Sequence, residues 1–576
     1  MRSLIAALLL PLLVPLAGHP AWGFGQDPQP APPPKPKGES SKLLTTKASL
    51  LFPHPTDKLI LETMNVMDSG KITFVVKMKD GKERAVLNGK AQKPYPSIVP
   101  ADLLATLQNL PNQQRAAVRA SRGALARLIK FTANGERIYY VAYTGKGYLV
   151  AGDGYESKLY DSIMEGMPVT SPDSKKVAFA AGRNGRWFVV QNDKESKDVD
   201  DILVGTLVYS PDSARLAFCA KKASQWSVVC EDKAYPALEG VAEGSPIFSP
   251  DSKKIAYAAF NKQNRIAVML EGRQIGEYDA VGEKTLAFTP DSAHILFAGK
   301  IKDRWYIQLD DKAYGPYEAV GEGSPLYSKD SKRIVWTAQL GGHWYVFENG
   351  KELTYPAKAP KKKPEPIVAE KILGGTPALS PDGKRLAFGM KKQGSWVVWC
   401  EGVESQAFEE LRDGSLRFTW DSTRMAFVGV RGGKFIPVID FKEYAPALEI
   451  SPTRVSGNDT SSTVAFAVRR QRTSEEVAEV RRKDPEATET YWMLMSDGED
   501  RYGPYNNIQA GALSVSWDGK RLAIPAEIKQ VWGIFINGEQ RTDGLPIWIR
   551  FHPETHLMEM IAVTKDGYMF VKEVYE

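Results

Sequence analysis

The chain has 576 residues, of which 43% are hydrophobic and 25% charged, a globular composition with enough apolar material for a large core. Its net charge of +6 is small for this length and argues against the concentrated basic surface of a nucleic-acid binder. Three cysteines exclude a disulfide framework and a four-thiolate zinc site within one chain. After the first twenty residues no apolar run reaches 18 residues, so the sequence predicts no membrane-spanning segment.

The N-terminus has the pattern of an export signal. Arg2 precedes an apolar run over residues 4–16, and Ala21-Trp22-Gly23 is a small-x-small cleavage site. Residues 1–23 are therefore predicted to be a signal peptide. Residues 24–46 are rich in proline and favour an extended spacer, because such a segment cannot pack a core. We expect the mature protein to be exported, to the periplasm or outside the cell.

A four-residue pattern of the type Ser-Pro-Asp-Ser recurs along the chain, and its first steps are 39, 39, 40 and 39 residues. It occurs at residues 171–174, 210–213, 249–252, 289–292, 328–331, 380–383, 419–422 and 516–519. Proline presets φ in a turn, and the aspartate side chain bonds its own backbone two residues on, so each tetrad predicts a tight turn. An apolar triplet such as Val177-Ala178-Phe179 follows most tetrads.

An aromatic residue, most often tryptophan, follows the same period and opens an alternating apolar run. It is found at Tyr148, Trp187, Trp226, Trp305, Trp344, Trp396, Phe435, Trp492, Trp532 and Tyr568. Alternating runs bounded by turn residues indicate four short strands per repeat. One such unit cannot bury both of its faces, whereas radial stacking covers them. The sequence thus predicts an all-β propeller fold of about twelve four-stranded repeats.

These repeats resemble those of the TolB-like family of β-propellers, also called WD40-like repeats, over roughly residues 47–576. A weaker resemblance is to the non-catalytic propellers of prolyl-oligopeptidase-type peptidases. The resemblance implies that the strand before each tetrad is innermost and that the tryptophan strand is third. The additional N-terminal domain of TolB has no counterpart in this sequence, so a role in the Tol–Pal system is not implied.

Twelve blades are many for one ring, since common propellers have about four to eight. A Lys- and Pro-rich stretch at 358–366 falls where the tryptophan step lengthens to 52 residues, and it favours a stiff linker. We predict two tandem propellers of about seven and five blades; six plus six and one irregular ring stay open. The predicted domains are a first propeller at 47–357 with a helical insertion at 101–130, the linker, and a second propeller at 367–576 with a charged insertion at 469–489.

Motifs of catalysis are missing from the sequence. It contains no Gly-x-Ser-x-Gly elbow and no Walker-type phosphate loop. His552 and His556 are four residues apart, but Pro553 lies between them in a turn position, which favours a structural turn over a zinc site. We predict no catalytic residue, metal or cofactor, and expect a non-enzymatic binding scaffold. The alternatives are a carbohydrate-active hydrolase or lyase with carboxylates in a propeller cleft, and a channel that receives a peptide.

The loops between the second and third strands of most repeats are basic, and in a propeller these loops emerge on one face. A ring of like charge attracts an acidic protein or an anionic polymer of the cell envelope. The candidate partner-binding residues are Arg183, Arg186, Lys221, Lys222, Lys262, Arg265, Lys302 and Arg304, with Arg481 and Arg482 of the charged insertion. The alternative is a self-compensating face, because the loops entering the first strands carry acids: Glu239, Glu243, Asp279, Glu283, Glu318 and Glu322.

Cys219 and Cys230 lie at the two ends of one predicted hairpin, 216–230. Symmetry about its turn predicts that they are roughly opposite each other, and a cross-strand disulfide is then compatible with an exported protein. Two reduced, buried cysteines are the alternative. Cys400 occupies the same repeat position as Cys230 and has no partner in the sequence.

Overall fold

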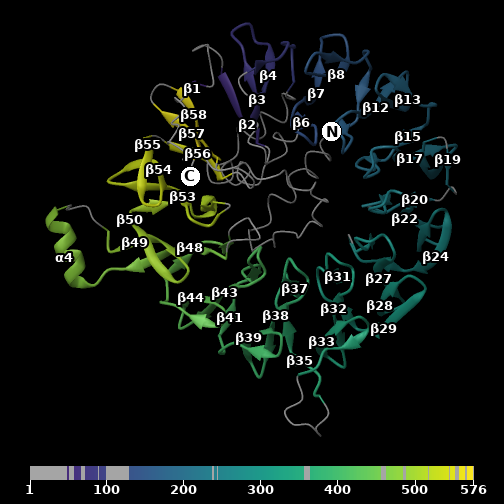
Figure 1. The fold of residues 1–576 in the computed structure, drawn as a ribbon. Coiled ribbons are helices and arrows are strands. Elements are labelled where there is room, and N and C mark those ends of the chain that lie inside the picture. Colours follow the sequence, from purple (N-terminus) through teal and green to yellow (C-terminus); the bar gives the residue numbers. More distant parts are fainter. Residues whose placement is uncertain are drawn as a thin grey trace, which may run out of the picture. The chain divides into compact units, whose positions relative to one another are not determined.

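The computed structural model describes residues 49–50, 58–66, 72–87, 90–98, 129–355 and 364–574, with short gaps at 232, 236–238, 243, 284, 456–461, 484–487, 517, 544, 552–556 and 565–566. Almost all of the regular structure in these residues is β-strand (Figure 1). The predicted signal peptide and spacer lie outside the described residues. So does the predicted helical insertion at 101–130, except for its last two residues, which belong to a strand.

One repeat shows how the sequence pattern becomes a blade. Its strands are β15 (Asp201–Ile202), β16 (Val208–Tyr209), β17 (Leu216–Lys222), β18 (Gln225–Cys230) and β19 (Lys233–Ala234). The order in the antiparallel sheet is β15-β17-β18-β19, and β16 also pairs with β17, so β15 and β16 are the two halves of a first strand. The tetrad 210–213 turns from the first strand into the second, and Trp226 lies on the third. This order confirms the predicted propeller blade.

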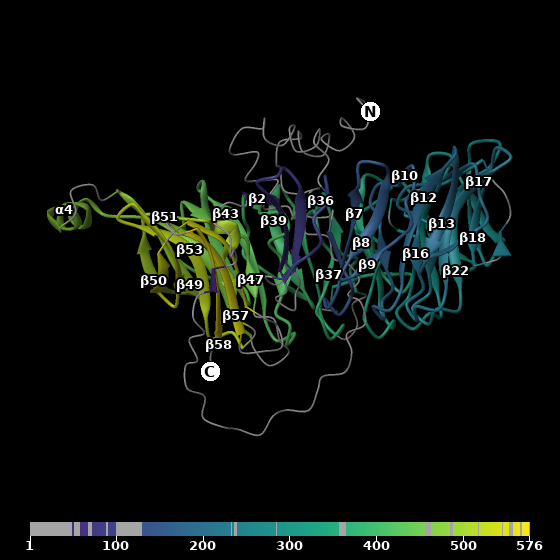
Figure 2. The ribbon, with the colours of Figure 1, turned by 90° about the horizontal axis from the view of Figure 1, so that it is seen from above.

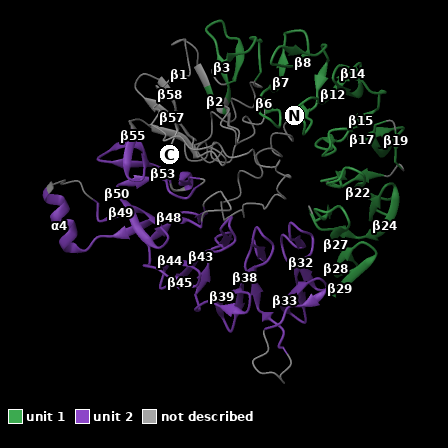
Figure 3. Cartoon of the chain, viewed as in Figure 1, with its two compact units in different colours: residues 1–17, 52–316 green, residues 18–51, 317–576 purple. Residues whose placement is uncertain are grey.

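The described residues form twelve such sheets, of four to six strands each, and the chain divides into two compact units (Figure 3). Unit 1 comprises residues 52–316 of the described part, and unit 2 comprises 317–576 together with β1. Within each unit consecutive sheets stand side by side, with first strands on the inner side of the row and fourth strands on the outer side (Figure 1).

Besides the sheet already described, unit 1 contains five others. Their strands are β2 (Lys58–Val66), β3 (Ile72–Lys77), β4 (Glu83–Leu87) and β5 (Lys90–Ala91); β6 (Ile129–Phe131), β7 (Ile138–Tyr143), β8 (Tyr148–Gly152) and β9 (Tyr155–Glu156); β10 (Ser162–Ile163), β11 (Val169–Thr170), β12 (Val177–Arg183), β13 (Arg186–Gln191) and β14 (Lys194–Glu195); β20 (Gly240–Val241), β21 (Ile247–Phe248), β22 (Ile255–Phe260), β23 (Ile266–Leu270) and β24 (Arg273–Tyr278); β25 (Ala280–Val281), β26 (Ala287–Phe288), β27 (Ile295–Ile301), β28 (Arg304–Leu309) and β29 (Lys312–Tyr317).

Unit 2 contains six sheets. Their elements are β30 (Ala319–Val320), β31 (Leu326–Tyr327), β32 (Ile334–Leu340), β33 (His343–Glu348), β34 (Lys351–Glu352) and β35 (Val368–Ala369); β36 (Lys371–Ile372), β37 (Ala378–Leu379), β38 (Leu386–Lys392), β39 (Ser395–Cys400) and β40 (Val403–Glu404); β41 (Glu410–Leu411), β42 (Arg417–Phe418), β43 (Met425–Arg431), β44 (Lys434–Ile439) and β45 (Lys442–Glu443); β46 (Glu449–Ile450), β47 (Arg454–Val455), β48 (Val464–Gln471), α4 (Ser474–Lys483), β49 (Thr490–Ser496) and β50 (Glu499–Tyr505); β51 (Asn507–Ile508), the 3-10 turn η2 (Ala510–Ala512), β52 (Ser514–Val515), β53 (Leu522–Ile528), β54 (Val531–Ile536) and β55 (Glu539–Asp543); β56 (Leu545–Phe551), β57 (Leu557–Thr564), β58 (Gly567–Val574) and β1 (Ser49–Leu50).

Two pairings bear on the predicted domain boundaries. β35 pairs with β33, and Thr354 bridges to Pro366, so the Lys- and Pro-rich segment leaves and rejoins the same sheet. The boundary between the two units lies earlier, at Pro316 and Tyr317. β1 pairs with β58, so a strand from near the N-terminus completes the C-terminal sheet. The division of the blades between rings stays a prediction.

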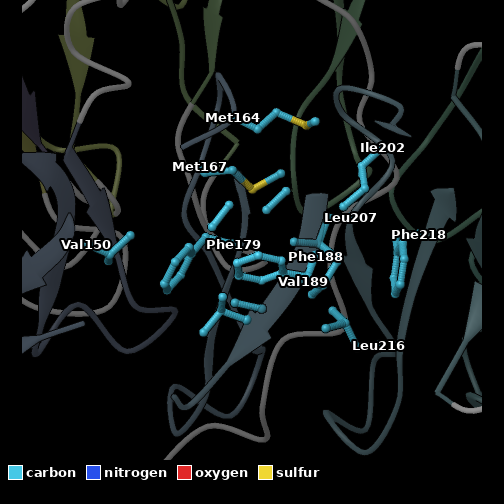
Figure 4. Close-up of a cluster of buried hydrophobic side chains, with 14 of the residues drawn as sticks. Val150, Met164, Met167, Phe179, Phe188, Val189, Ile202, Leu207, Leu216 and Phe218 are labelled. Carbon is cyan, nitrogen blue, oxygen red and sulfur yellow. The ribbon is translucent and has the colours of Figure 1, made fainter. Parts of the chain in front are cut away.

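The core lies between consecutive sheets rather than inside any one of them. Figure 4 shows one such cluster, in which Phe179 and Phe188 of one sheet meet Leu207 and Leu216 of the next. A second cluster joins the sheets of β17 and β22, and half-buried Trp226 packs at its edge. Each blade therefore buries its faces only by stacking, as the repeat length requires.

The tetrads also join neighbouring blades. Within the turn, the Ser171 hydroxyl donates to Asp173 Oδ1 at 2.5 Å, and that oxygen accepts the Lys175 N–H at 3.0 Å. Between blades, the Asp173 N–H donates to Ser213 Oγ at 2.9 Å. The same inter-blade bond recurs from residues 134 to 174, 212 to 252, 251 to 292 and 382 to 422. The last serine of the tetrad is thus the acceptor of a bond from the preceding blade.

Candidate functional site

The structure places the candidate basic residues of unit 1 in or beside the hairpins between second and third strands. Arg183 and Arg186 are cross-strand neighbours at the end of the β12–β13 hairpin, and Lys222 lies opposite Gln225 in β17–β18. Lys262 and Arg265 flank the β22–β23 turn, and Lys302 and Arg304 flank the β27–β28 turn. The prediction that these residues occupy equivalent hairpins of successive repeats is confirmed for unit 1.

Several of these cations are engaged within the chain. Arg183 pairs with Glu195 at 3.0 Å, and its guanidinium lies 5.1 Å from the centre of the Tyr160 ring. The hydrogen bond from Arg183 holds the pKa of the Glu195 carboxyl below its usual value. Arg186 pairs with Asp198 at 2.8 Å and also with Asp200. The charge of both arginines is therefore largely balanced by acids of their own sheet and, through Asp200, of the next one.

The other candidates differ in their surroundings. Arg265 pairs with Glu277 at 3.0 Å and Asp279 at 3.1 Å. The ammonium of Lys221 lies 5.7 Å from the centre of the Trp226 ring. Lys222, Lys262, Lys302, Arg304 and Arg482 have exposed side chains, and exposed Arg481 lies 3.8 Å from Glu489. Partner binding by these residues stays a prediction.

Acids that enter the first strands have a structural task at the same hairpins. Asp279 Oδ2 accepts the backbone N–H of Lys302 at 2.5 Å, and Glu318 accepts those of Gly341 and Gly342 at 3.1 and 2.9 Å. Asp200 does the same for Ala223 at 2.8 Å. Acids and basic hairpins therefore share one face of each sheet row, as the self-compensating alternative requires.

The expected juxtaposition of Cys219 and Cys230 is wrong. The register pairs Cys219 with Val228 and Cys230 with Ala217, so the two cysteines are not cross-strand partners. Both are free, buried thiols, as is Cys400. Burial raises the pKa of Cys219 to about 12, which makes it an inert apolar side chain at neutral pH. Sequence symmetry failed because the turn centre is Ala223-Ser224, and the two cysteines are not equidistant from it.

The charged insertion predicted at 469–489 contains a helix. Residues 469–471 still belong to β48, and α4 follows at Ser474. A capping box starts the helix: Thr473 N–H donates to Glu476 Oε2 at 2.8 Å, and Glu476 N–H donates to Thr473 Oγ1 at 3.2 Å. Both views show α4 projecting beyond β49 and β50 (Figures 1 and 2). Of its described side chains only Val477 and Val480 are half-buried, and the rest are exposed.

Sequence inspection missed one group of basic residues, Arg412, Arg417 and Arg454. Arg417 and Arg454 lie on the first strands β42 and β47 of consecutive sheets, and Arg412 lies just after β41. The position two residues before the tetrad is apolar in six earlier repeats and is arginine at Arg417. The repeat with Arg454 has no tetrad, but Arg454 pairs with Ala465 as Arg417 pairs with Ala426, so the two positions are equivalent.

Within the described residues, no three or more His, Cys, Asp and Glu side chains are grouped to hold a metal ion. His552 and His556 lie outside that part of the chain. No helix in the described part is long and apolar enough to cross a membrane.

No protein-family model and no curated protein matches the chain. Similar solved structures include the Dos1 propeller, with 12% identity, TM-score 0.26, and coverage of 53% of this chain and 90% of that one. The β-propeller domain of the Trilobed protease from Pyrococcus furiosus has 16% identity, TM-score 0.22, and coverage of 47% and 94%. TolB from Acinetobacter baumannii has 12% identity, TM-score 0.20, and coverage of 58% and 75%.

With scores this low, the fold is defined by the sheets themselves. Successive antiparallel sheets of four to six strands, most of them with a tetrad turn between the first and second strands, pack on one another and make the chain a β-propeller protein.

Proposed function

We propose that the protein is an exported, non-enzymatic propeller scaffold that binds a protein or an anionic polymer of the cell envelope, with α4 as its principal contact. The proposal of export rests on the signal-peptide pattern of residues 1–23. The observation that carries the binding role is α4 itself, a capped helix that projects from one blade.

The long connection that carries α4, and the little surface that α4 buries, support a role in binding. The equivalent hairpin in the preceding sheet turns with two residues, Gly432 and Gly433, whereas residues 472–489 join β48 to β49. An isolated helix of 10 residues is marginal in water, and burial adds little to this one. Its capping box and its acidic first turn of Glu475 and Glu476 favour helix formation without tertiary packing. A helix held ready in this way suits a partner that covers it.

The experiment is a crosslinking pull-down from the envelope fraction of the source cell with the tagged mature chain. In the deletion variant, residues 472–489 are replaced by Gly-Gly, which copies the Gly432-Gly433 turn and keeps the Gln471–Thr490 cross-strand pair. The matched control is Lys520→Ala, which removes an exposed lysine beside the tetrad of the next blade and is not one of the candidate partner-binding residues. We expect one saturable partner that the wild type and the control capture and the deletion variant loses.

Two results contradict the proposal. Equal capture by the deletion variant removes α4 from the binding surface. Enrichment of polysaccharide whose chains become shorter on incubation favours the carbohydrate-active enzyme instead. Thermal unfolding of the deletion variant is measured in parallel, and we expect an unchanged midpoint because α4 buries little.

A further inference from the structure

In two first strands of unit 2, an arginine stands where other sheets have an apolar residue. The residue that opens the second half of the first strand is Val169, Val208, Ile247, Ala287, Leu326 or Ala378 in the sheets from β11 to β37. In the next two consecutive sheets this position holds Arg417 and Arg454. Because the first strands line the inner side of the row, both arginines start from that side (Figure 1).

Hydrogen bonds between sheets fix the surroundings of these arginines. Thr453 Oγ1 donates to the carbonyl of Ser415 at 3.0 Å, which ties the backbone before Arg454 to the backbone before Arg417. Arg412 Nη1 donates to the carbonyl of Ile450 at 2.5 Å, and Arg454 Nη2 donates to that of Gly511 at 2.8 Å. Arg412, Arg417 and Arg454 therefore gather where three consecutive sheets meet.

Among the described residues, no acid balances the positive charge of this group. No carboxylate of the described residues pairs with any of the three, and all three are half-buried. Arg424, in the same sheet as Arg417, shows the contrast, since it pairs with Asp440 at 3.0 Å and Asp497 at 2.8 Å.

Two further details show that the group lacks acceptors and counter-charge among the described residues. Arg454 Nε is buried and has no hydrogen-bond partner among the described residues. Burial lowers the pKa of Arg412 and Arg454, and the like charge of Arg417 lowers that of Arg454 further. Asp413 is the acid next to Arg412 in the sequence, and its Oδ1 lies beside Gly374 of the preceding sheet.

Half-burying cations beside one another without a counter-charge destabilises a fold. Six other sheets place alanine, valine, isoleucine or leucine at the same position, and the sheet after that of Arg454 places Ser514 there, so the blade does not need arginine. Guanidinium groups present forked N–H donors that match the oxygens of phosphate and carboxylate groups. An oxyanion at this junction would supply both the missing charge and the missing acceptors.

We propose that Arg412, Arg417 and Arg454 form a binding site for an oxyanion, the phosphate or carboxylate group of a ligand that reaches the inner side of unit 2. The site is separate from α4, so its test is independent of the envelope partner proposed above.

The test is the thermal unfolding midpoint of the full chain, titrated with inorganic phosphate or with succinate against sodium chloride of equal ionic strength. A ligand that binds only the folded state raises the midpoint with the logarithm of its concentration once this exceeds Kd, by about 2–5 °C at ten times its Kd. Phosphate also stabilises proteins non-specifically, but that effect grows linearly with its concentration and is the same in wild type and variants. The phosphate and succinate arms distinguish the two ligand chemistries.

The decisive variant is Arg417→Ala/Arg454→Ala, because alanine is the native residue at this position in β26 and β37. We expect it to unfold at or above the wild-type temperature in chloride and to lose the logarithmic response. The control, Arg431→Ala, removes an arginine of the same sheet that pairs with Glu443 at 2.9 Å, and we expect it to keep the response.

Three results overturn the proposal: no logarithmic response of the wild type to either anion, a logarithmic response that survives in the double variant, or a double variant that unfolds at a lower temperature in chloride. If the double variant does not fold, Arg417→Lys decides. Lysine keeps the positive charge but lacks the forked N–H donors of arginine. A roughly tenfold loss of anion affinity therefore supports the site, and unchanged affinity overturns it.

Discussion

The last serine of each tetrad has two roles that oppose each other energetically. Ser213 adopts a left-handed backbone with φ of 63°, which costs a non-glycine residue about 1–2 kcal/mol. Its hydroxyl accepts the inter-blade bond from the Asp173 N–H at 2.9 Å. Where glycine takes this position, as at Gly383 with φ of 73°, the backbone is relaxed but no hydroxyl is present.

We therefore expect Ser213→Ala to destabilise the protein by about 1–2 kcal/mol, because the bond is lost and the left-handed backbone remains. Ser213→Gly loses the same bond but relieves the backbone, so its loss is smaller by about 1 kcal/mol. Urea unfolding of the two variants beside wild type measures both changes. Equal losses for alanine and glycine would show that the backbone conformation carries no cost here.

At this scale the sequence predicted half of the arrangement. Proline and aspartate in the tetrad indicate a turn by local chemistry, and the Asp173 bond to the Lys175 N–H confirms it. The inter-blade bond joins residues 40 positions apart, so no local pattern contains it. The only sign of this bond in the sequence is that serine recurs at a position where a turn alone would favour glycine.

Hairpins between second and third strands are the elements on which the blades differ most. The β12–β13 hairpin turns through Asn184 and Gly185, with φ of 51° and 74°. The β17–β18 hairpin turns through Ala223 and Ser224, with φ of 47° and 67°. Both turns have positive φ at two consecutive residues, for which asparagine and glycine are the preferred pair.

A reciprocal exchange of these turns tests the cost. We expect Ala223→Asn/Ser224→Gly to stabilise the protein by about 1 kcal/mol, because the backbone strain falls and the Asp200 bond to the N–H of residue 223 is kept. Asn184→Ala/Gly185→Ser is expected to destabilise it by a similar amount. Denaturant unfolding of both variants provides the measurement, and changes of the same sign in both would refute this account of the turns.

At the scale of elements the sequence located the strands well, because alternation and turn residues are local signals. It did not locate the acid that supports each hairpin, since Asp200 and the N–H that it accepts are 23 residues apart. In the sheet that carries α4, Leu448 stands where Glu409 precedes the first strand of the sheet before it. Loss of that acid coincides with the longer connection, a link visible only once the sheets are aligned in space.

At the scale of the whole molecule, the same aspartate hydrogen bonds recur in the tetrads of several blades and affect how the protein responds to acid. Asp173, Asp212, Asp251 and Asp330 each accept a serine hydroxyl and a backbone N–H two residues on. The serine hydrogen bond is the main cause that lowers the pKa of each carboxyl from its ordinary value. The tetrad acids of several blades therefore titrate together.

A folded-state pKa below the unfolded value, about 3.9 for aspartate, means that the unfolded chain takes up protons first as the pH falls. The stabilisation is complete above that unfolded value and is lost as the pH falls from it through the lower folded values. We expect the urea midpoint to vary little with tetrad protonation between pH 7 and pH 5 and to fall steeply below pH 4.

Asp212→Asn is the matched variant, since Asn134 already fills the equivalent position and accepts the Thr132 hydroxyl at 2.7 Å. It removes one titrating group without removing the turn, so its midpoint should fall less steeply with acid than that of wild type. Parallel curves for variant and wild type would mean that the tetrads do not set the acid limit of the fold.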